Sequence, residues 1–339
     1  MIGFFFRGRP CWKIAGLILL VCGASGSPTE SRANSWPVAD SRVRFLTAGN
    51  QDFWPWFSPE GSQILFSRRV GGTWELLLVP VAGGEPRKLA QSPLPVSATR
   101  ANWSKRNNLI AFTGTSSDDR STIWVIKPDG SDAHDVSIRG LSNQVVYPSW
   151  YPDGEQLAAM DAQDMAIKRI DLSRGVAVTL TDNKRVLTGM PSVSPDGKWI
   201  AFAGQESKGQ QYDQSRNSLW LVGEGGAARN VESNPGQGRA PTWSPSGKQL
   251  AFESTRGSTA GLYAIFIINR DGTGLIQVTN PTLNADHPVW SPDGRQLAFS
   301  AHDAARGIGR SIGIIVLNAS AAPTSMSGRS LPHRRSQWR

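Results

Sequence analysis

Residues with side chains suited to binding recur at one position of a repeated pattern in this chain. At intervals of 43 to 50 residues, one such residue lies directly before a proline or an alanine. The six residues at this position are Trp54, Arg100, Tyr147, Met190, Ala240 and His287. Tryptophan, tyrosine and arginine dominate the binding energy of protein interfaces, because each combines a large contact area with a polar group. We therefore expect a binding site where the fold gathers these residues around a concave mouth. The alternative is that these residues pack between blades, with Trp54 beside Trp56.

Charged residues and histidines accompany this position. Arg239 and Asp286 each come directly before a residue of the set, so we include both in the expected site. Asp286 and His287, together with His302 and Asp303, would offer two imidazoles and two carboxylates, which suffice chemically for a divalent metal. No third histidine is placed to join them, so we expect no metal. A metal-dependent lyase or glycosidase, or a sugar-binding protein, that uses the same mouth is the alternative function.

The sequence contains no recognisable catalytic motif. The nucleophile elbow Gly-x-Ser-x-Gly of α/β-hydrolases does not occur in it. Both cysteines, Cys11 and Cys22, lie near the start of the chain. The recurring aspartates belong to turn signals and are not paired for acid and base chemistry. We therefore expect a protein that is not an enzyme and that holds no cofactor.

The residues of the expected site are carried by a unit that occurs six times. In its cleanest copy, residues 287–300, an extended run ends at Trp-Ser, Pro-Asp-Gly follows, and Leu-Ala-Phe begins the next run. Proline presets φ for a type I turn, and glycine supplies the positive φ that leads into the next strand. Lys105 and Asn107 replace proline and glycine in the second copy, and asparagine is the usual substitute at positive φ. The copies of the turn unit span residues 55–61, 101–107, 148–154, 191–197, 241–247 and 288–294.

Each copy reads as a set of short strands. Runs of β-branched and aromatic residues alternate with turn signals, and no stretch keeps a helical period. A repeat of this length is typical of a four-stranded propeller blade. The sixth copy lacks a fourth strand after Val316, whereas residues 42–47 form an unassigned strand before the first copy. We therefore expect an all-β fold, a six-bladed β-propeller of four-stranded blades over residues 43–318. The N-terminal strand completes the last blade, which removes exposed sheet edges.

The Trp-Ser-Pro-Asp-Gly units, each followed by a short Leu-Ala-Phe strand as in residues 290–299, resemble the repeat of the TolB-type, WD-like six-bladed β-propellers. Similar units occur in the propeller domains of prolyl-oligopeptidase relatives. The resemblance implies a protein–protein interaction module of the periplasm or cell envelope. About 20 polar residues precede the propeller, which is too few for the α/β domain that TolB carries there. We therefore expect this chain to lack that domain.

Residues 1–24 have the pattern of a secretory signal peptide. Basic residues precede the apolar run 14–21, and small residues follow it. The run is shorter than the roughly 20 residues that span a bilayer. We therefore expect cleavage, no membrane span in the mature protein, and a periplasmic or secreted location. Val21 departs from the lipoprotein pattern that would lipidate Cys22, so we expect cleavage in preference to lipidation.

The remaining segments add few constraints on function. We expect residues 25–42 to be a polar leader and residues 319–339 to be a disordered basic tail. Much of the formal net charge of +9 lies at the two ends of the chain, so we expect no nucleic-acid partner but a monomer that binds an envelope or periplasmic protein. The loop 204–218 is the longest between second and third strands, and its Tyr212 and Arg216 could extend the binding face or belong to a surface insertion.

Overall fold

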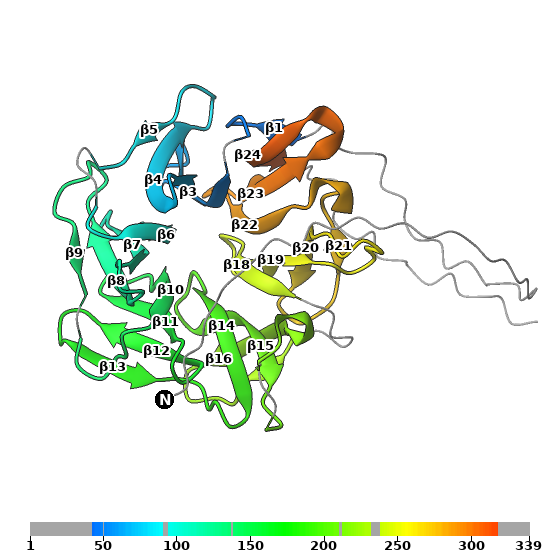
Figure 1. The fold of residues 1–339 in the computed structure, drawn as a ribbon. Coiled ribbons are helices and arrows are strands. Elements are labelled where there is room, and N and C mark those ends of the chain that lie inside the picture. Colours follow the sequence, from blue (N-terminus) through cyan, green and yellow to red (C-terminus); the bar gives the residue numbers. More distant parts are fainter. Residues whose placement is uncertain are drawn as a thin grey trace, which may run out of the picture. The chain divides into compact units, whose positions relative to one another are not determined.

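The computed structural model describes residues 43–49, 51–90, 94–136, 138–209, 212–231 and 238–317. The expected signal peptide, polar leader and C-terminal tail lie outside these residues. The described residues belong to one compact unit, Val38–Arg339. They form six antiparallel sheets of four strands each, which surround a common centre (Figure 1). This architecture confirms the prediction of an all-β, six-bladed propeller.

Each sheet is one blade. Blade 1 contains β2 (Asp52–Phe57), β3 (Gln63–Val70), β4 (Thr73–Pro80) and β5 (Arg87–Lys88). Blade 2 contains β6 (Ser97–Trp103), β7 (Ile110–Thr115), β8 (Ser121–Ile126) and β9 (His134–Asp135). Blade 3 contains β10 (Val145–Trp150), β11 (Gln156–Asp161), β12 (Ala166–Asp171) and β13 (Val176–Thr179). Blade 4 contains β14 (Val186–Val193), β15 (Trp199–Glu206), β16 (Ser218–Gly223) and β17 (Arg229–Asn230). Blade 5 contains β18 (Arg239–Trp243), β19 (Gln249–Ser254), β20 (Ala264–Asn269) and β21 (Ile276–Gln277).

Blade 6 is built from both ends of the propeller. It contains β22 (Asp286–Trp290), β23 (Gln296–Asp303), β24 (Ile308–Val316) and β1 (Val43–Phe45). Strand β1 pairs antiparallel with β24, with Val43 opposite Ile315 and Phe45 opposite Gly313 (Figure 1). The predicted closure by the N-terminal strand is therefore confirmed.

Helical structure in the described part of the chain is confined to short 3-10 turns. These are η2 (Gln214–Arg216), η3 (Pro281–Leu283) and η4 (Ala304–Arg306). Among these residues no helix has the length and apolar character needed to cross a bilayer.

The first strand of every blade is interrupted at the same place. In each pairing of a first with a second strand the register shifts, as between Phe53 and Trp56 in blade 1. At this bulge a residue other than glycine takes a positive φ of 45° to 59° in all six blades. These residues are Trp54, Arg100, Tyr147, Met190, Ala240 and His287. A left-handed conformation is costly for residues with a Cβ atom, and it tends to persist where surrounding structure enforces it for function.

The core lies between neighbouring blades. The second strands supply its largest fully buried side chains, because their phenylalanines pack against the adjoining sheet. Each buried phenylalanine contributes roughly 2–3 kcal/mol by leaving water. They are Phe66, Phe112, Phe202, Phe252 and Phe299.

Two of the repeat tryptophans form hydrogen bonds to the preceding blade. The indole N–H of Trp150 in blade 3 donates to the carbonyl of Asn102 in blade 2 at 3.1 Å. The indole N–H of Trp243 in blade 5 donates to the carbonyl of Ser192 in blade 4 at 2.9 Å. In these two blades the repeat tryptophan is therefore an element of the fold, whereas Trp103 donates to Asn108 within its own blade.

The Pro-Asp-Gly turns have the expected geometry. In the last copy the amide of Gly294 donates to the carbonyl of Ser291 at 2.9 Å, and Gly294 has a φ of 73°. The buried Ser291 hydroxyl donates to Asp293 and accepts from the Gln296 amide. These bonds hold the turn without any free carboxylate, so the turn aspartate is structural.

Candidate functional site: the channel mouth

The six residues with positive φ converge at the centre of the propeller. Together with the proline or alanine that follows each of them, they line a narrow cavity of about 90 Å³. The bulge is the local cause, because a left-handed residue redirects its side chain out of the regular alternation of the strand. The structure therefore brings together the residues that the sequence singled out at this position. That they bind a partner stays a prediction.

Arg100 occupies the middle of a stack of aromatic rings. Its guanidinium carbon lies 4.4 Å from the Trp54 ring centroid and 4.3 Å from the Tyr147 ring centroid. A cation between two ring faces gains from both quadrupoles, which holds the side chain at the mouth without an acidic partner. The only hydrogen bond of its side chain to a described residue is a long one, 3.4 Å to Thr99 Oγ1.

Trp54 has contacts that belong to both of the roles considered for it. Its ring is half-buried and packs on Trp74 at 4.8 Å and on Phe53 at 5.4 Å between centroids. Its indole N–H donates to Nε2 of His287 at 3.0 Å. The ring therefore packs within blade 1 and also forms part of the mouth.

A cluster of paired charges adjoins His287. Arg239 Nε lies 3.2 Å from Glu253 Oε1, and Arg310 forms an ion pair with Asp286. The amide of His287 donates to Glu253 Oε2 at 2.8 Å, and its Nδ1 lies 3.0 Å from Asp286 Oδ1. Burial works against the charged form of the Arg239 guanidinium, but Glu253 and neighbouring tyrosines outweigh it and raise the pKa of Arg239. The cluster is charge-compensated and links blades 5 and 6 at the mouth.

The same cluster is the candidate metal site. Glu253, Asp286 and His287 offer ligand atoms within 4.8 Å of one another, and they are the one such group in the described residues. Both carboxylates are engaged by arginines, and Nε2 of His287 accepts from Trp54. Nδ1 then carries the ring proton toward Asp286, so neither ring nitrogen is free to coordinate. These residues do not fit a metal, and the exposed His302 is not part of the group.

Asp52 and the two loop residues named from the sequence, Tyr212 and Arg216, have structural partners. Asp52 is fully buried and forms a bidentate pair with Arg68 at 2.6 and 2.9 Å. Tyr212, from the loop 204–218, accepts a 2.7 Å hydrogen bond from Asn217, and burial raises the pKa of its phenol. Arg216 lies 3.6 Å from Asp213 within the same loop. These contacts stay local to the loop and to β2–β3.

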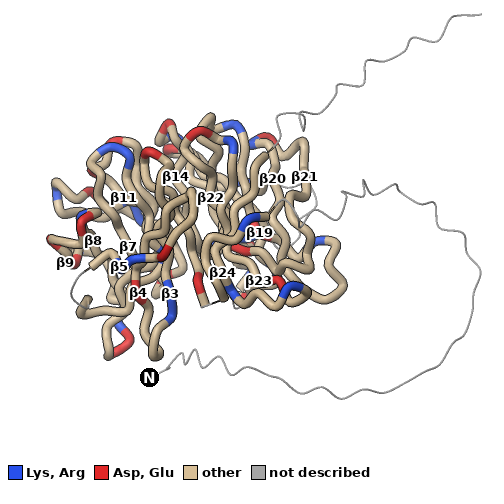
Figure 2. Tube along the Cα trace, turned by 90° about the horizontal axis from the view of Figure 1, so that it is seen from above, with Lys and Arg blue, Asp and Glu red and all other residues tan. Residues whose placement is uncertain are grey.

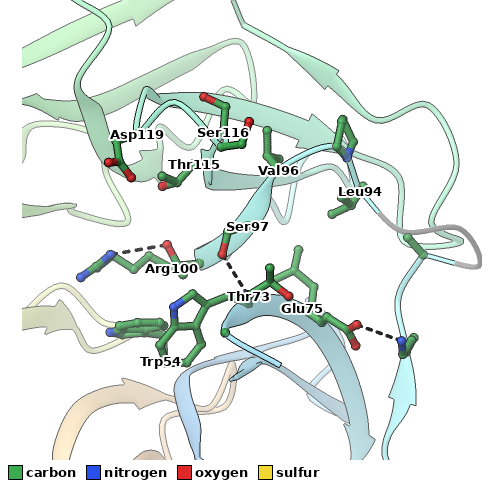
Figure 3. A pocket seen from close by; sticks show the side chains of 18 residues that line it. Trp54, Thr73, Glu75, Leu94, Val96, Ser97, Arg100, Thr115, Ser116 and Asp119 are labelled. Atoms are coloured by element: carbon green, nitrogen blue, oxygen red, sulfur yellow. Dashed lines mark hydrogen bonds and ion pairs between the residues drawn. The ribbon is translucent and has the colours of Figure 1, made fainter. Parts of the chain in front are cut away.

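A larger cavity of about 710 Å³ opens between blades 1 and 2 beside the stack (Figure 3). Trp54 and Arg100 line its inner end, and Trp74, Leu94 and Asp119 line other walls. Sequence reasoning missed this cavity, together with Glu253 and Arg310. The one available signal was Glu253 itself, an acid in a second strand at a position where other blades carry Ser, Thr, Met or Ala.

Six four-stranded blades closed by an N-terminal strand around a central channel define the chain as a six-bladed β-propeller. The family model of the TolB beta propeller domain (PD40) matches residues 39–222, more than half of the chain. This chain therefore belongs to the TolB β-propeller domain family.

Solved structures share the fold at low sequence identity. The structure of a putative TolB from Agrobacterium tumefaciens superposes with a TM-score of 0.59 and 20% identity, covering 80% of this chain and 91% of that one. TolB from Acinetobacter baumannii gives 0.57 and 19%, covering 76% and 64%. An oligogalacturonate lyase in complex with manganese gives 0.53 and 14%, covering 82% and 94%. At these identities the likeness concerns the fold alone.

A curated relative matches part of the sequence more closely. It is an uncharacterized peptidase, YuxL, of Bacillus subtilis, which is 31% identical over 155 residues. The match covers 44% of this chain and 21% of the relative. The chain thus spans about a fifth of that relative's length.

Proposed function

We propose that this chain is an exported, non-enzymatic β-propeller that binds a protein of the periplasm or cell envelope through the mouth of its channel. The observation that carries the proposal is the position of Arg100 between Trp54 and Tyr147. In the part of the chain that the structure describes, this arginine makes no ion pair, unlike Arg68, Arg239 and Arg310. A preorganised arginine flanked by aromatic rings has the composition of an interface hot spot.

The chemistry of the mouth supports binding over catalysis. Glu253 and Asp286 are each neutralised by an arginine, so neither is available as a general base. Along the described part of the chain, acidic and basic residues are interspersed with one another (Figure 2). A mixed surface of this kind suits a protein partner better than a polyanion.

The test is affinity capture from solubilised envelope with the purified chain as bait. A variant with Trp54, Arg100, Tyr147 and His287 all changed to alanine is compared with the wild type, after circular dichroism and thermal unfolding show that it folds. The matched control is Arg295→Ala, which removes an exposed arginine at a Pro-Asp-Gly turn away from the mouth. We expect one protein to be captured by the wild type and the control and lost from the quadruple variant. Retention of that protein by the quadruple variant would show that the mouth is not the binding surface.

Sugar binding or carbohydrate chemistry at the same mouth is the second candidate. The half-buried rings of Trp54 and Trp74 favour it, because sugars stack on exposed indoles. Quenching of tryptophan fluorescence by an oligosaccharide series, with release of new reducing ends as the second readout, tests this candidate. Saturable quenching without protein capture would place it ahead of the first.

A further inference from the structure

Three of the seams, which are the contacts between neighbouring blades, contain the same hydrogen bond at the mouth. In three seams, the amide of the positive-φ residue donates to a side chain on the second strand of the preceding blade. Tyr147 donates to Thr113 at 3.1 Å, His287 to Glu253 at 2.8 Å, and Trp54 to Ser300 at 3.2 Å. These bonds tie blade 3 to 2, blade 6 to 5, and blade 1 to 6.

The seam between blades 1 and 2 lacks this bond although it has the residues to form it. The equivalent amide is that of Arg100, and the equivalent acceptor is the hydroxyl of Ser67. Ser67 is fully buried, and its Oγ has no partner among the described residues. Nε of Arg100 is also buried without a partner. Unsatisfied buried polar atoms are uncommon in native proteins, so each one needs an explanation, such as a water or a ligand that binds there.

The cavity of about 710 Å³ lies at this same seam. Its volume falls within the range of roughly 300–1,000 Å³ that is usual for ligand sites. Figure 3 shows Arg100 and Trp54 at one end, with Leu94 and Val96 on the opposite wall. The larger cavity therefore lies at the one seam that has the residues for this bond and does not form it.

The charges of the cavity select among ligands. The Trp54 and Tyr147 rings both contact the Arg100 guanidinium, and its Nε is buried, so we take its terminal nitrogens as the donors that a ligand would meet. A carboxylate matches such an edge, because planar N–H donors and carboxylate oxygens pair in register. Glu75 is bonded to Lys88 at 2.9 Å, whereas Asp119, which forms no ion pair with a described residue, adds a negative charge to the lining. The cavity thus favours a ligand with one carboxylate and apolar neighbours over a polyanion.

We propose that the cavity between blades 1 and 2 binds an extended peptide segment of the partner protein, with an acidic side chain on the edge of Arg100 and a neighbouring apolar side chain against Trp74 and Leu94. This inference rests on the proposed protein-binding function. It adds to that function the seam where the peptide lies and the residue type that the peptide must carry.

The test uses two capped, fluorescein-labelled hexapeptide pools and the full purified chain. One pool has the central pair Leu-Glu and the other has Leu-Gln, with mixed residues at the remaining positions. We expect anisotropy to show about tenfold tighter binding of the Glu pool, the usual effect of a charge-assisted pair. Arg100→Gln should abolish the preference, whereas the control Arg69→Gln, at an exposed arginine outside the cavity, should keep it.

A second variant keeps the proposal testable if Arg100→Gln does not fold. Ser117→Trp adds bulk at an exposed residue lining the cavity and leaves Arg100 intact, so it should weaken binding of both pools at least fivefold. Equal binding of the Glu and Gln pools by the wild type would overturn the carboxylate assignment, while capture of a protein through the mouth would still stand. Binding of neither pool, together with saturation by an oligosaccharide, would overturn this inference and favour the second candidate function.

Discussion

The indole N–H of Trp54 donates to Nε2 of His287 across 3.0 Å, joining the first blade to the last. Through this bond the paired charges of blades 5 and 6 connect to the ring stack of blades 1, 2 and 3. Glu253 accepts a hydrogen bond from the His287 amide, and His287 accepts one from the Trp54 indole. The Trp54 ring in turn contacts the Arg100 guanidinium. The mouth is therefore one network that spans five of the six blades.

Loss of the Trp54–His287 bond should cost about 1 kcal/mol of coupling energy, the usual net value for a hydrogen bond. A double-mutant cycle with Trp54→Phe and His287→Leu, followed by urea unfolding, measures it. Phenylalanine keeps an aromatic face for Arg100, so the cycle isolates the N–H donor. Strict additivity of the two changes would contradict the bond.

Glu253 should be among the most sensitive residues to substitution. Its side chain is 1% exposed and compensates Arg239, which is 14% exposed. Glu253→Gln leaves that guanidinium buried without its counter-charge, and we expect a loss of about 3–5 kcal/mol in the free energy of unfolding.

The matched control for Glu253→Gln is Asp118→Asn. Asp118 pairs with Arg120 at 2.8 Å, and both side chains are about 60% exposed. Solvent screens such a pair, so we expect no measurable change in the denaturation midpoint. Equal effects of the two substitutions would contradict the assignment of Glu253 to a buried, stabilising pair.

The blades were predictable from the sequence because their signals are local. Each Pro-Asp-Gly turn and each short apolar strand is recognised from a few adjacent residues, and the spacing of the turns gives the period. The strand before the first copy, which is β1 in the structure, is recognised in the same way. The repeat also placed Trp54, Arg100, Tyr147 and His287 in one ring. Their bonds were not predictable, because Glu253, the partner of Arg239, is marked only as an acid at a repeat position, which does not say what it pairs with, and no repeat position marks Arg310, the partner of Asp286.

The cavity between blades 1 and 2 was hidden from the sequence for a different reason. It lies at the seam where Ser67 does not bond to the Arg100 amide, whereas Thr113 and Ser300 at the same repeat position do bond to the equivalent amides. Residues of the same type in the same register thus behave differently, and only the packing of a particular seam distinguishes them.

Two turn glycines with positive φ should differ in their tolerance of alanine. A Cβ atom on Gly130, at a φ of 85°, would lie 2.2 Å from the carbonyl oxygen of Leu89, which is backbone and cannot rotate away. A Cβ atom on Gly140, at a φ of 95°, would meet nothing within 4 Å. Both substitutions should cost about 1 kcal/mol through backbone strain, and Gly130→Ala should cost a further 1–3 kcal/mol through the clash. Thermal unfolding of the two variants measures the difference, and equal shifts would contradict the clash.

Part of the stability contributed by the Ser291 turn should depend on pH. The Ser291 hydroxyl and then the Arg295 amide lower the pKa of Asp293 below its ordinary value of 3.8. A carboxyl with a lowered pKa stabilises the fold above that ordinary value, and this contribution is lost as the pH falls through the folded-state pKa. We therefore expect Ser291→Ala to destabilise the protein more at pH 6 than at pH 2.5.

Blade 5 provides the control for this pH dependence. Its turn has Ser246 where blade 6 has Asp293, and Ser244 lies 3.1 Å from the Ser246 hydroxyl. Ser244→Ala removes the same hydroxyl without a carboxylate, so its cost should be the same at both pH values. Urea unfolding of both variants at the two pH values tests the expectation, and a constant cost for Ser291→Ala would refute it.

The pairing of β1 with β24 determines how the propeller resists a pulling force. Val43 lies opposite Ile315 in an antiparallel pair, so the chain leaves both strands at the same end of the ladder. A force applied to the two flanking segments acts in the unzipping geometry, so it loads the hydrogen bonds between β1 and β24 one after another. In the shear geometry it would load them all together. Blade 6 is therefore the mechanically weak point of the ring, and the other five blades become exposed to the force only after β1 has peeled away.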